Sequence, residues 1–504
     1  MTFKIKDMGA SVLGIGRRKA IKILGASSAA CAFTLFDTGI SEGKTNSESV
    51  MASGSFFRRK RPIGIHRNWY YFSDESGKPL VFTGSHTWGR RREKKMWVSD
   101  GWDPGKFNKY LDFLQHWNHN YIRLWMWEQE GTVDIWKKNE DGKYDLSKLN
   151  QAFFDRTRSF VEAADARGIY VGVMLFQGWS GTCEASIPDW PRHPMNKSNN
   201  INGIDGDPDK ITYGNKVHSL DDPRIVGFQE MYVRKMIETL SDHNNILWEI
   251  GNETIESSIP WKTHMVQFIR DCEKSKPRQH LILTGTGNGV GNESIFITQS
   301  DTFSPCVVTK WASLDDPFIG NPPIPSDQLG KPIILDNDHL GNHFLRFTPL
   351  NQRNWTWKSF TRGNHPIHMD CYDVYWDGAH PTPDHPVPGV ATHPHYDPQR
   401  KSLGDVQLFA RRMDLSQIKP VSDASICSTT YCLVNPGKEY LAYQPDVNSE
   451  IVLQLLQGKY RVETFDTGNS RSESFVLKWE GGKKTFAKPA HVGEDWVLYV
   501  KVAR

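Results

Sequence analysis

The 504-residue sequence lacks the features of several large protein classes. Its seven cysteines are an odd number and include no Cys-x-x-Cys pair, so the sequence predicts mostly free thiols and no cysteine metal site. Lys and Arg number 61 against 58 Asp and Glu, a formal net charge of +3, which gives no electrostatic reason to expect nucleic acid or a membrane surface as a partner. No apolar run is long and uninterrupted enough to predict a membrane span.

The short motifs of several enzyme classes are missing too. There is no Gly-x-Ser-x-Gly nucleophile elbow, no His-Glu-x-x-His zinc motif and no P-loop lysine, which disfavours a peptidase. Residues 285–291 are glycine-rich, but their spacing does not fit a dinucleotide-binding turn. The six histidines in residues 365–395 alternate with prolines and have no helical ligand spacing, so we expect a loop beside a cleft, with no metal and no cofactor.

What the sequence does contain is a sizeable core and many tryptophans. Apolar residues make up 38% and charged residues 24%, as in a folded globular chain, and the length suits one large catalytic domain with a smaller one. The 18 tryptophans could stack on sugar rings or fill a tryptophan-rich core, and composition alone does not separate these two interpretations.

The N-terminal stretch is similar to an export signal. Arg17 and Arg18 are followed by a spacer, two apolar residues and Lys22, which resembles a twin-arginine signal, and residues 23–36 form a mildly apolar run. We predict an export signal in residues 1–40 and a tether in 41–62, hence a periplasmic or secreted protein. A lipoprotein anchor at Cys31 is the weaker option, and an incidental basic patch on a cytoplasmic protein is the alternative.

From about residue 64, short apolar runs alternate with amphipathic stretches, which predicts an α/β fold made of parallel βα units. Helices are expected at residues 103–117, 145–167 and 226–240. Strands are expected at residues 80–84, 121–125, 169–176, 245–251, 280–284, 307–311, 332–335 and 366–369. Eight strands predict a closed (β/α)₈ TIM barrel over residues 63–412.

The pattern changes after residue 412. Short strands separated by Pro-Gly, Gly-Lys and Gly-Gly turns predict an antiparallel β-sandwich domain over residues 413–504. These strands are expected at residues 431–434, 439–443, 451–453, 460–465 and 496–500.

Carboxylates follow two of the predicted barrel strands. Strand 245–251 leads into Asn252 and Glu253, and strand 332–335 leads into Asp336 and Asp338. Functional groups of a barrel gather at the C-terminal ends of its strands, and alternation places Asp336 and Asp338 on one face. Glycosidases need two carboxylates, one to protonate the leaving oxygen and one to attack or to activate water. The alternative is that the two aspartates cap a helix or pair with arginines.

Several stretches resemble clan A glycoside hydrolases of the apiosidase-like kind, which carry a C-terminal β-sandwich labelled as collagen-binding. The most specific stretch is Asn-Ile-Leu-Trp-Glu-Ile-Gly-Asn-Glu at 245–253. The other matching stretches are residues 72–80, 83–88, 120–125, 357–363 and 431–440. The resemblance covers nearly all of residues 60–502 and implies the barrel and the sandwich.

The resemblance also implies roles for individual residues. Glu253 takes the place of the acid/base, and Asp338 takes the place of the nucleophile, which is usually Glu in this family. Aspartate is one methylene shorter, so both a retaining and an inverting mechanism stay open, and Asp336 is the alternative second carboxylate. Arg123, at the end of the second strand, is expected to steady the nucleophile.

Further candidates follow from their positions at strand ends. There, aromatic faces would stack on sugars and polar groups would contact sugar hydroxyls. The alternative for the aromatic residues is that they pack in the core. The predicted substrate-binding residues are His86, Trp88, Arg123, Trp125, Gln177, Trp179, Asn252, Trp311, His339 and Asp370. The sequence thus predicts an exported glycoside hydrolase that cleaves a plant or marine polysaccharide or oligosaccharide, with retention favoured. The alternative is a non-catalytic extracellular carbohydrate- or matrix-binding protein; collagen binding is not expected.

Overall fold

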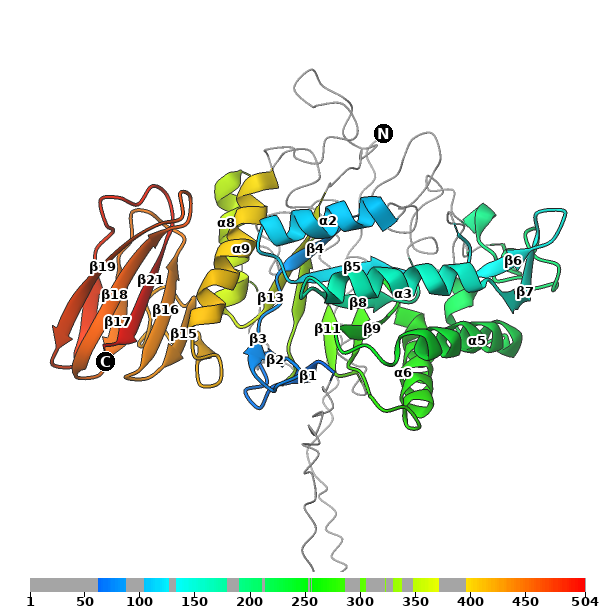
Figure 1. Ribbon diagram of the computed structural model, residues 1–504. Coiled ribbons are helices and arrows are strands. Elements are labelled where there is room, and N and C mark those ends of the chain that lie inside the picture. Colours follow the sequence, from blue (N-terminus) through cyan, green and yellow to red (C-terminus); the bar gives the residue numbers. More distant parts are fainter. Residues whose placement is uncertain are drawn as a thin grey trace, which may run out of the picture. The chain divides into compact units, whose positions relative to one another are not determined.

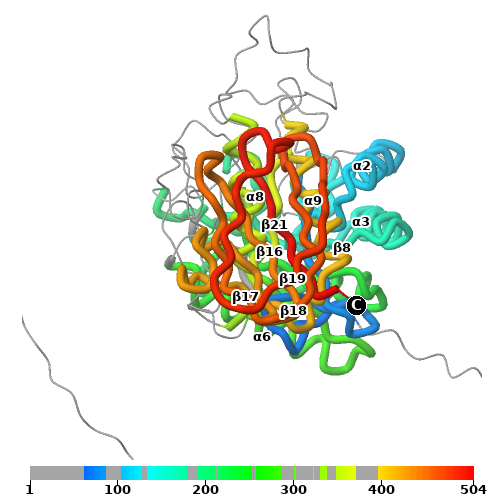
Figure 2. Tube along the Cα trace, turned by 90° about the vertical axis from the view of Figure 1, so that its left-hand side faces the viewer, coloured from blue at the N-terminus to red at the C-terminus, as the bar shows by residue number. Residues whose placement is uncertain are grey.

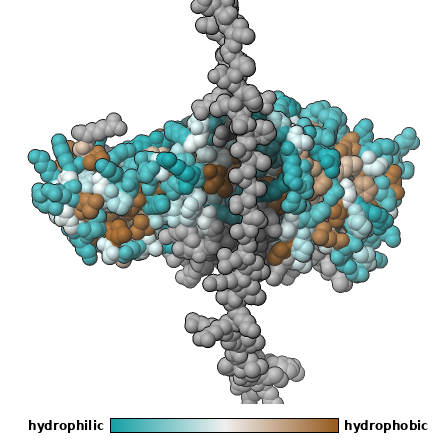
Figure 3. Space-filling view, turned by 90° about the horizontal axis from the view of Figure 1, so that it is seen from below, coloured by the Kyte–Doolittle hydropathy of each residue, from teal (hydrophilic) through white to brown (hydrophobic). Residues whose placement is uncertain are grey.

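The structure is a computed structural model of the whole chain. It describes residues 62–87, 104–126, 133–178, 190–210, 214–252, 254, 256–285, 300–304, 322, 330–337, 348–370 and 396–503. Within these ranges no helix is long and apolar enough to cross a membrane. Of the cysteines in them, Cys272, Cys427 and Cys432 are free thiols. Figure 3 shows a mainly hydrophilic described surface on one face, with small hydrophobic patches scattered over it.

Eight parallel strands form the central sheet (Figure 1). They are β4 (Gly84–Thr87), β5 (Tyr121–Trp125), β8 (Tyr170–Met174), β9 (Ile246–Ile250), β10 (Ile282–Gly285), β11 (Thr302–Ser304), β12 (Ile334–Asn337) and β13 (His365–Asp370). Their order is β11-β10-β9-β8-β5-β4-β13-β12. The first strand, β4, therefore pairs with both the second, β5, and the last, β13. All other neighbours follow one another along the chain, which is the strand order of a (β/α)₈ barrel, so the predicted parallel sheet in barrel order is confirmed.

Alternation along the strands places an apolar layer inside the sheet. This layer is made by side chains of five strands and of the residue two before β4, namely Tyr121, Leu247, Leu283, Ile334, Ile367 and Phe82. A small antiparallel sheet adds Phe72 to the same cluster; its strands are β1 (Gly64–Ile65), β2 (Phe72–Ser73) and β3 (Pro79–Leu80). Because the period of a strand is two, the next inward-facing residues toward the strands' C-terminal ends are Arg123, Glu249 and Asp336.

Helices pack on the outer face of the sheet and bury a second, larger core. They are α2 (Pro104–His116), α3 (Gln151–Asp165), α5 (Pro223–Leu240) and α6 (Ile259–Glu273), with 3₁₀ turns at Trp190–Arg192, Asn215–His218 and Glu256–Ser258. Helix α5 begins where the sequence dictates: the Asp222 side chain accepts a hydrogen bond from the Arg224 amide, and Pro223 occupies the first turn. The helices predicted at residues 103–117 and 226–240 agree with α2 and α5.

Two predicted elements were partly wrong. Residues 145–149 are not helical but belong to strand β7 (Tyr144–Leu149), which pairs with β6 (Trp136–Lys138), and α3 begins only at Gln151. The first barrel strand is β4, four residues later than predicted, because Leu80 belongs to β3 of the small antiparallel sheet. At Gly84 the chain passes close to the β5 backbone. A Cβ atom on Gly84 would lie 1.8 Å from the carbonyl oxygen of Tyr121. The strand predicted at residues 307–311 lies outside the described residues; β11 holds the sixth place.

The C-terminal region is antiparallel, as predicted. A six-stranded sheet has the order β14-β15-β16-β21-β18-β19, and a two-stranded sheet pairs β17 with β20. The strands are β14 (Lys419–Val421), β15 (Cys432–Asn435), β16 (Glu439–Gln444), β17 (Ile451–Leu455), β18 (Gly458–Asp466), β19 (Arg471–Trp479), β20 (Gly482–Phe486) and β21 (Trp496–Val502). Side chains from both sheets share one core around Trp496. Strands β14, β19 and β20 were not predicted.

The opposite face of the six-stranded sheet packs on two helices, α8 (Pro349–Thr361) and α9 (Asp397–Arg412), as both ribbon and tube show (Figures 1 and 2). Trp357 and Phe409 of these helices contact Phe465 of the sheet, with ring centroids 5.9 and 5.1 Å from it. Arg353 on α8 adds a buried ion pair with Asp495, 2.8 Å between Nη2 and Oδ1. The residue numbers at which one domain ends and the next begins stay a prediction.

Candidate active site

The polar group inside the sheet is centred on Arg123 of β5. Its Nε donates to Oε2 of Glu249 on β9 at 3.0 Å, and its Nη2 donates to the other oxygen of that carboxylate. Its Nη1 donates to Oδ2 of Asp336 on β12. Nη2 also donates to Oδ1 of Asn252 at 3.0 Å. One guanidinium therefore connects the C-terminal parts of the second, fourth and seventh strands of the sheet.

His86 joins this group from the first strand. Its Nε2 lies 3.0 Å from Oδ2 and 3.2 Å from Oδ1 of Asp336. Its ring stacks on Trp125, with centroids 5.3 Å apart and planes 26° apart. Trp125 lies two residues beyond Arg123 on the same strand face, so the aromatic ring continues the polar layer toward the strand ends.

Because the group is buried, its carboxylates need these contacts with Arg123 and His86 in place of water. The side chains of Glu249 and Asp336 are 0% exposed and that of Arg123 is 1% exposed. A carboxylate in such surroundings is tolerated only with a charged or hydrogen-bonding partner, because its hydration is lost. Arg123 partners both carboxylates, and His86 gives Asp336 a second contact. The group is therefore rigid and pre-organised, as the framework of a catalytic site must be.

Tyr121 lies one layer below Arg123 and packs closely against Gly172 of β8. A Cβ atom on Gly172 would lie 2.2 Å from the Tyr121 hydroxyl and 3.7 Å from Oε2 of Glu249. Burial, and next the negative charge of Glu249, raise the pKa of Tyr121 well above its ordinary value, so the phenol stays protonated. Gly172 thus makes room for an aromatic ring directly beneath the carboxylate.

The backbone around Asn252 is fixed by its neighbour strand. The Asn252 amide donates to the Phe176 carbonyl at 2.9 Å, and the Gly178 amide donates to the Asn252 carbonyl at 2.6 Å, which brings Gln177 beside Asn252. The preceding Gly251 has φ of 66°, a conformation that favours glycine. Asn252 is therefore held in place both through its backbone and through its side chain's contact with Arg123.

The structure brings six of the predicted residues to the C-terminal ends of neighbouring strands. They are His86, Arg123, Trp125, Gln177, Asn252 and Asp336. Six other predicted residues lie outside the described residues, so their placement stays a prediction. They are Trp88, Trp179, Glu253, Trp311, Asp338 and His339.

Asp370 is not brought to this group. It lies at the end of β13 on the outer face of the sheet, where both its oxygens accept hydrogen bonds from Arg400 of α9, Oδ2 from Nε at 2.8 Å. Nε2 of His368, on the same outer face, lies 3.6 Å from Oδ2 of Asp370. Burial opposes the charge of Asp370, but the Arg400 guanidinium overcomes it and holds the pKa of the carboxyl below its ordinary value. The pair anchors α9 to the sheet.

Sequence reasoning missed Glu249. Its strand reads Ile-Leu-Trp-Glu-Ile, and every residue in it is buried. Trp248 faces outward and donates to Glu273 on α6 at 2.8 Å, so alternation turns Glu249 inward. A lone Glu inside an apolar strand needs a buried cation, and this signal was available in the sequence beside the more conspicuous Asn252 and Glu253.

The parallel sheet thus has the strand order of a barrel, and a buried arginine–carboxylate group lies near the C-terminal ends of its strands. The model of the family described as "Cellulase (glycosyl hydrolase family 5)" matches residues 73–331. The chain belongs to glycosyl hydrolase family 5 and is a glycoside hydrolase with a (β/α)₈ barrel fold. The predicted enzyme class is thereby confirmed.

Solved structures agree on the fold. A protein titled "Glycoside hydrolase" superposes with a TM-score of 0.60 at 14% identity, covering 88% of this chain and 97% of that one. A family 5 glycoside hydrolase from Bacteroides vulgatus gives 0.58 at 14% identity, covering 88% and 94%. Another glycoside hydrolase structure from the same organism gives 0.55 at 12% identity, covering 88% and 83%. No curated protein sequence matches the chain.

Proposed function

We propose that this glycoside hydrolase cleaves glycosidic bonds in a plant or marine polysaccharide or oligosaccharide, with Glu253 as general acid/base and Asp338 as nucleophile. The observation that carries the proposal is the Arg123 group. It holds Asn252, the residue before Glu253, and Asp336, two residues before Asp338, through one guanidinium. If the alternation of β12 continues for two more residues, Asp338 would share the inward face of Asp336.

The proposed reaction proceeds in two steps with retention. The Asp338 carboxylate attacks the anomeric carbon, and the bond to the leaving oxygen breaks as Glu253 gives that oxygen its proton. Water then attacks the glycosyl–Asp338 ester, and Glu253 takes the water's proton, which restores both carboxyl groups. Asn252 would contact a sugar hydroxyl beside the reacting centre, and Trp125 would offer an aromatic face. Arg123, Asp336 and His86 keep these groups in position.

The finer features of the chain belong to the same proposal. We infer an apiosidase-like relative within the clan, on the sequence stretches at 72–80 and 245–253. The C-terminal sheets would form a β-sandwich that supports the barrel, since they share a core with α8 and α9. Collagen binding is not proposed. The paired Arg17 and Arg18 support export to the periplasm or beyond.

The test is a screen of neutral and acidic plant and marine polysaccharides and their oligosaccharides with wild type and Glu253→Gln. Loss of a general acid/base should reduce turnover by about 10²- to 10⁴-fold while thermal unfolding stays unchanged. Glu238→Gln is the matched control, because Glu238 is exposed on α5. Retention of more than about a tenth of the activity in Glu253→Gln would refute the assignment.

A further inference from the structure

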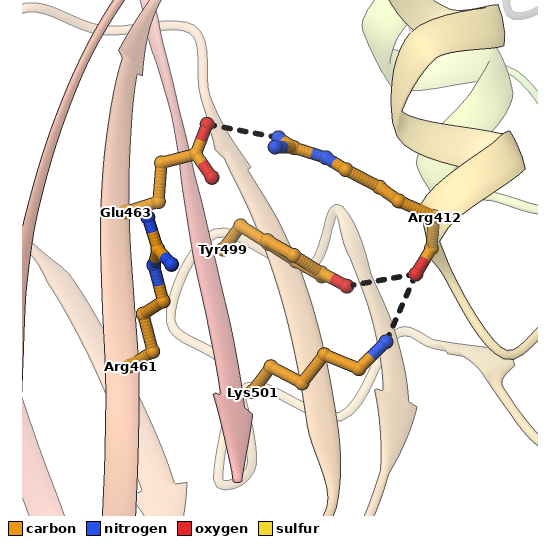
Figure 4. Close-up of a pocket in the computed structure, with 5 residues that line it drawn as sticks. All are labelled: Arg412, Arg461, Glu463, Tyr499 and Lys501. Atoms are coloured by element: carbon orange, nitrogen blue, oxygen red, sulfur yellow. Dashed lines mark hydrogen bonds and ion pairs between the residues drawn. The ribbon is translucent and has the colours of Figure 1, made fainter. Parts of the chain in front are cut away.

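A concave site that includes no residue of the Arg123 group lies between the C-terminal end of α9 and the strands β18 and β21. It is a cavity of about 340 Å³ lined by Arg412, Arg461, Glu463, Tyr499 and Lys501 (Figure 4). The size falls in the range of small-ligand pockets, about 300–1,000 Å³. Three of the five lining residues are cationic, so the cavity has the character of an anion site.

The three cationic side chains differ in the ion pairs and hydrogen bonds that they make. Arg412 pairs with Glu463 at 2.9 Å, and Lys501 pairs with Glu439 at 2.9 Å and donates to the Arg412 carbonyl at 2.9 Å. Figure 4 shows the Arg412 side chain directed at Glu463 and the Lys501 ammonium directed at the Arg412 carbonyl. Arg461 is exposed, and its described hydrogen bond is a long one, 3.4 Å, to the Ser474 hydroxyl. Its guanidinium fork is therefore open to a ligand.

The register of the sheet concentrates positive charge beside the cavity. Arg461 lies directly opposite Lys501 across the β18–β21 ladder, and Lys459 lies directly opposite Lys478 across the β18–β19 ladder. Lys459 and Lys478 are exposed, two residues along the same face from Arg461. Like charges in opposed positions destabilise a sheet, and the ion pair of Lys501 with Glu439 offsets this cost only in part. A bound polyanion would remove that cost.

We propose that this cavity and the adjoining basic row of Lys459 and Lys478 bind an anionic polysaccharide through its sulfate esters or carboxylates. The Arg461 fork and the Lys501 ammonium would hold the oxyanion, with bidentate hydrogen bonds from the guanidinium. Glu463 would accept from a sugar hydroxyl. The site goes beyond catalysis: it keeps the chain on its polymer and does not depend on the roles of Glu253 and Asp338. A glycan is the favoured polyanion because the chain is a glycoside hydrolase.

The experiment uses the full-length chain carrying Glu253→Gln to prevent cleavage, and a polymer that is recovered uncut after the run shows that binding alone was measured. Affinity electrophoresis at low and raised ionic strength compares dextran sulfate, polygalacturonate, neutral dextran and single-stranded DNA. The test variant is Arg461→Ala with Lys501→Ala. The matched control is Lys483→Ala with Lys488→Ala, which removes the same charge from exposed lysines outside the cavity.

The test variant should bind the anionic glycan at least about tenfold more weakly, the size expected when a charged hydrogen bond is lost, and the control less than about twofold. Preference for dextran sulfate identifies sulfate esters, and preference for polygalacturonate identifies carboxylates; either supports the proposal. Equal weakening in test and control variants would overturn it, as would equal binding of DNA or no binding of either anionic glycan. Because Lys501 also bonds within the protein, Arg461→Ala alone is measured too and should reproduce at least part of the loss with unchanged thermal unfolding.

Discussion

Arg123 and Glu249 are joined side by side inside the sheet, with Nε donating to Oε2 at 3.0 Å and Nη2 donating to Oε1. This two-pronged contact fixes the plane of the guanidinium, which leaves Nη1 for Asp336 and a second bond of Nη2 for Asn252. The geometry of the candidate site therefore depends on a carboxylate that would not itself touch substrate. Glu249 is a positioning residue acting through Arg123.

Replacing Arg123 should be costly for the fold. Arg123→Met leaves two buried carboxylates without their cation, and we expect a loss of about 3–5 kcal/mol in the free energy of unfolding, measured by urea titration. Arg158→Met is the matched control, because the Arg158–Asp242 pair, 2.6 Å apart, is partly exposed and should contribute less than about 1 kcal/mol. Equal losses of unfolding free energy in the two variants would show that burial does not determine how much the contacts of Arg123 stabilise the protein.

The contact between Gly172 and Tyr121 makes a second prediction. Gly172→Ala should destabilise the protein by about 1–3 kcal/mol, because the new methyl group would overlap the Tyr121 hydroxyl. Tyr121→Phe in the same chain should recover most of this loss, and the double-mutant cycle measures the coupling. Gly227→Ala is the control: it lies in α5 with nothing within 4 Å and should stabilise by about 0.5–1 kcal/mol. Additive effects of the Gly172 and Tyr121 changes would contradict the overlap.

Two buried histidines predict how stability depends on pH. Burial lowers the pKa of His119 and of His365 to about 3, and in His365 the Nδ1 atom accepts from the Phe82 amide at 2.9 Å, which a protonated ring could not do. Both rings are neutral when folded but take up a proton near pH 6.5 when unfolded, so stability is complete above that pH and is lost as pH falls toward 3.

Each of the two histidines contributes a slope of up to about 1.4 kcal/mol per pH unit. Urea unfolding between about pH 6.5 and 4.5 measures this slope before most carboxylates titrate. His365→Gln, which keeps a polar side chain without the titrating ring, should reduce the slope by up to about 1.4 kcal/mol per pH unit. An unchanged slope would show that His365 is charged in the folded state or that other groups determine the acid sensitivity.

Asp338 and Asp336 can be told apart by chemical rescue. Asp338→Ala should abolish turnover, and azide should partly restore it by occupying the vacated nucleophile site. Asp336→Ala should lose activity without rescue, because it breaks the contacts with Arg123 and His86 instead. Proton NMR of the first-formed sugar should show the retained anomer. An inverted product would make Asp338 a general base, and rescue confined to Asp336→Ala would transfer the nucleophile role to Asp336.

Export is tested at the paired arginines. Arg17→Lys with Arg18→Lys should leave the protein in the cytoplasm, and Lys4→Arg with Lys6→Arg, made upstream of the pair, should leave the location unchanged. Fractionation followed by immunoblotting gives the measurement. Equal periplasmic yield from wild type and the Arg17/Arg18 variant would remove the twin-arginine assignment.

The strands of the sheet were predictable because their apolar runs are bounded by turns; residues 121–125 were predicted with the observed limits. It was harder to predict which face of the sheet each side chain lies on, since a shift of one residue in register moves every side chain to the other face. Asp370 was predicted to face the substrate but lies on the outer face, because the β13–β4 register aligns the preceding Met369 with the inward-facing His86. The lone Glu249 in its apolar strand indicates a buried cation, but no local pattern identifies Arg123 as the partner, because it lies 126 residues away.

The aromatic core between α8, α9 and the six-stranded sheet couples the stability of the barrel to that of the C-terminal region. Trp357 is fully buried, and Phe409 and Phe465 are nearly so, although they come from opposite sides of the contact. A chain cut after α9 would present the first two of these rings to water and expose an aggregation-prone patch. The barrel and the C-terminal sheet should therefore melt in one calorimetric transition.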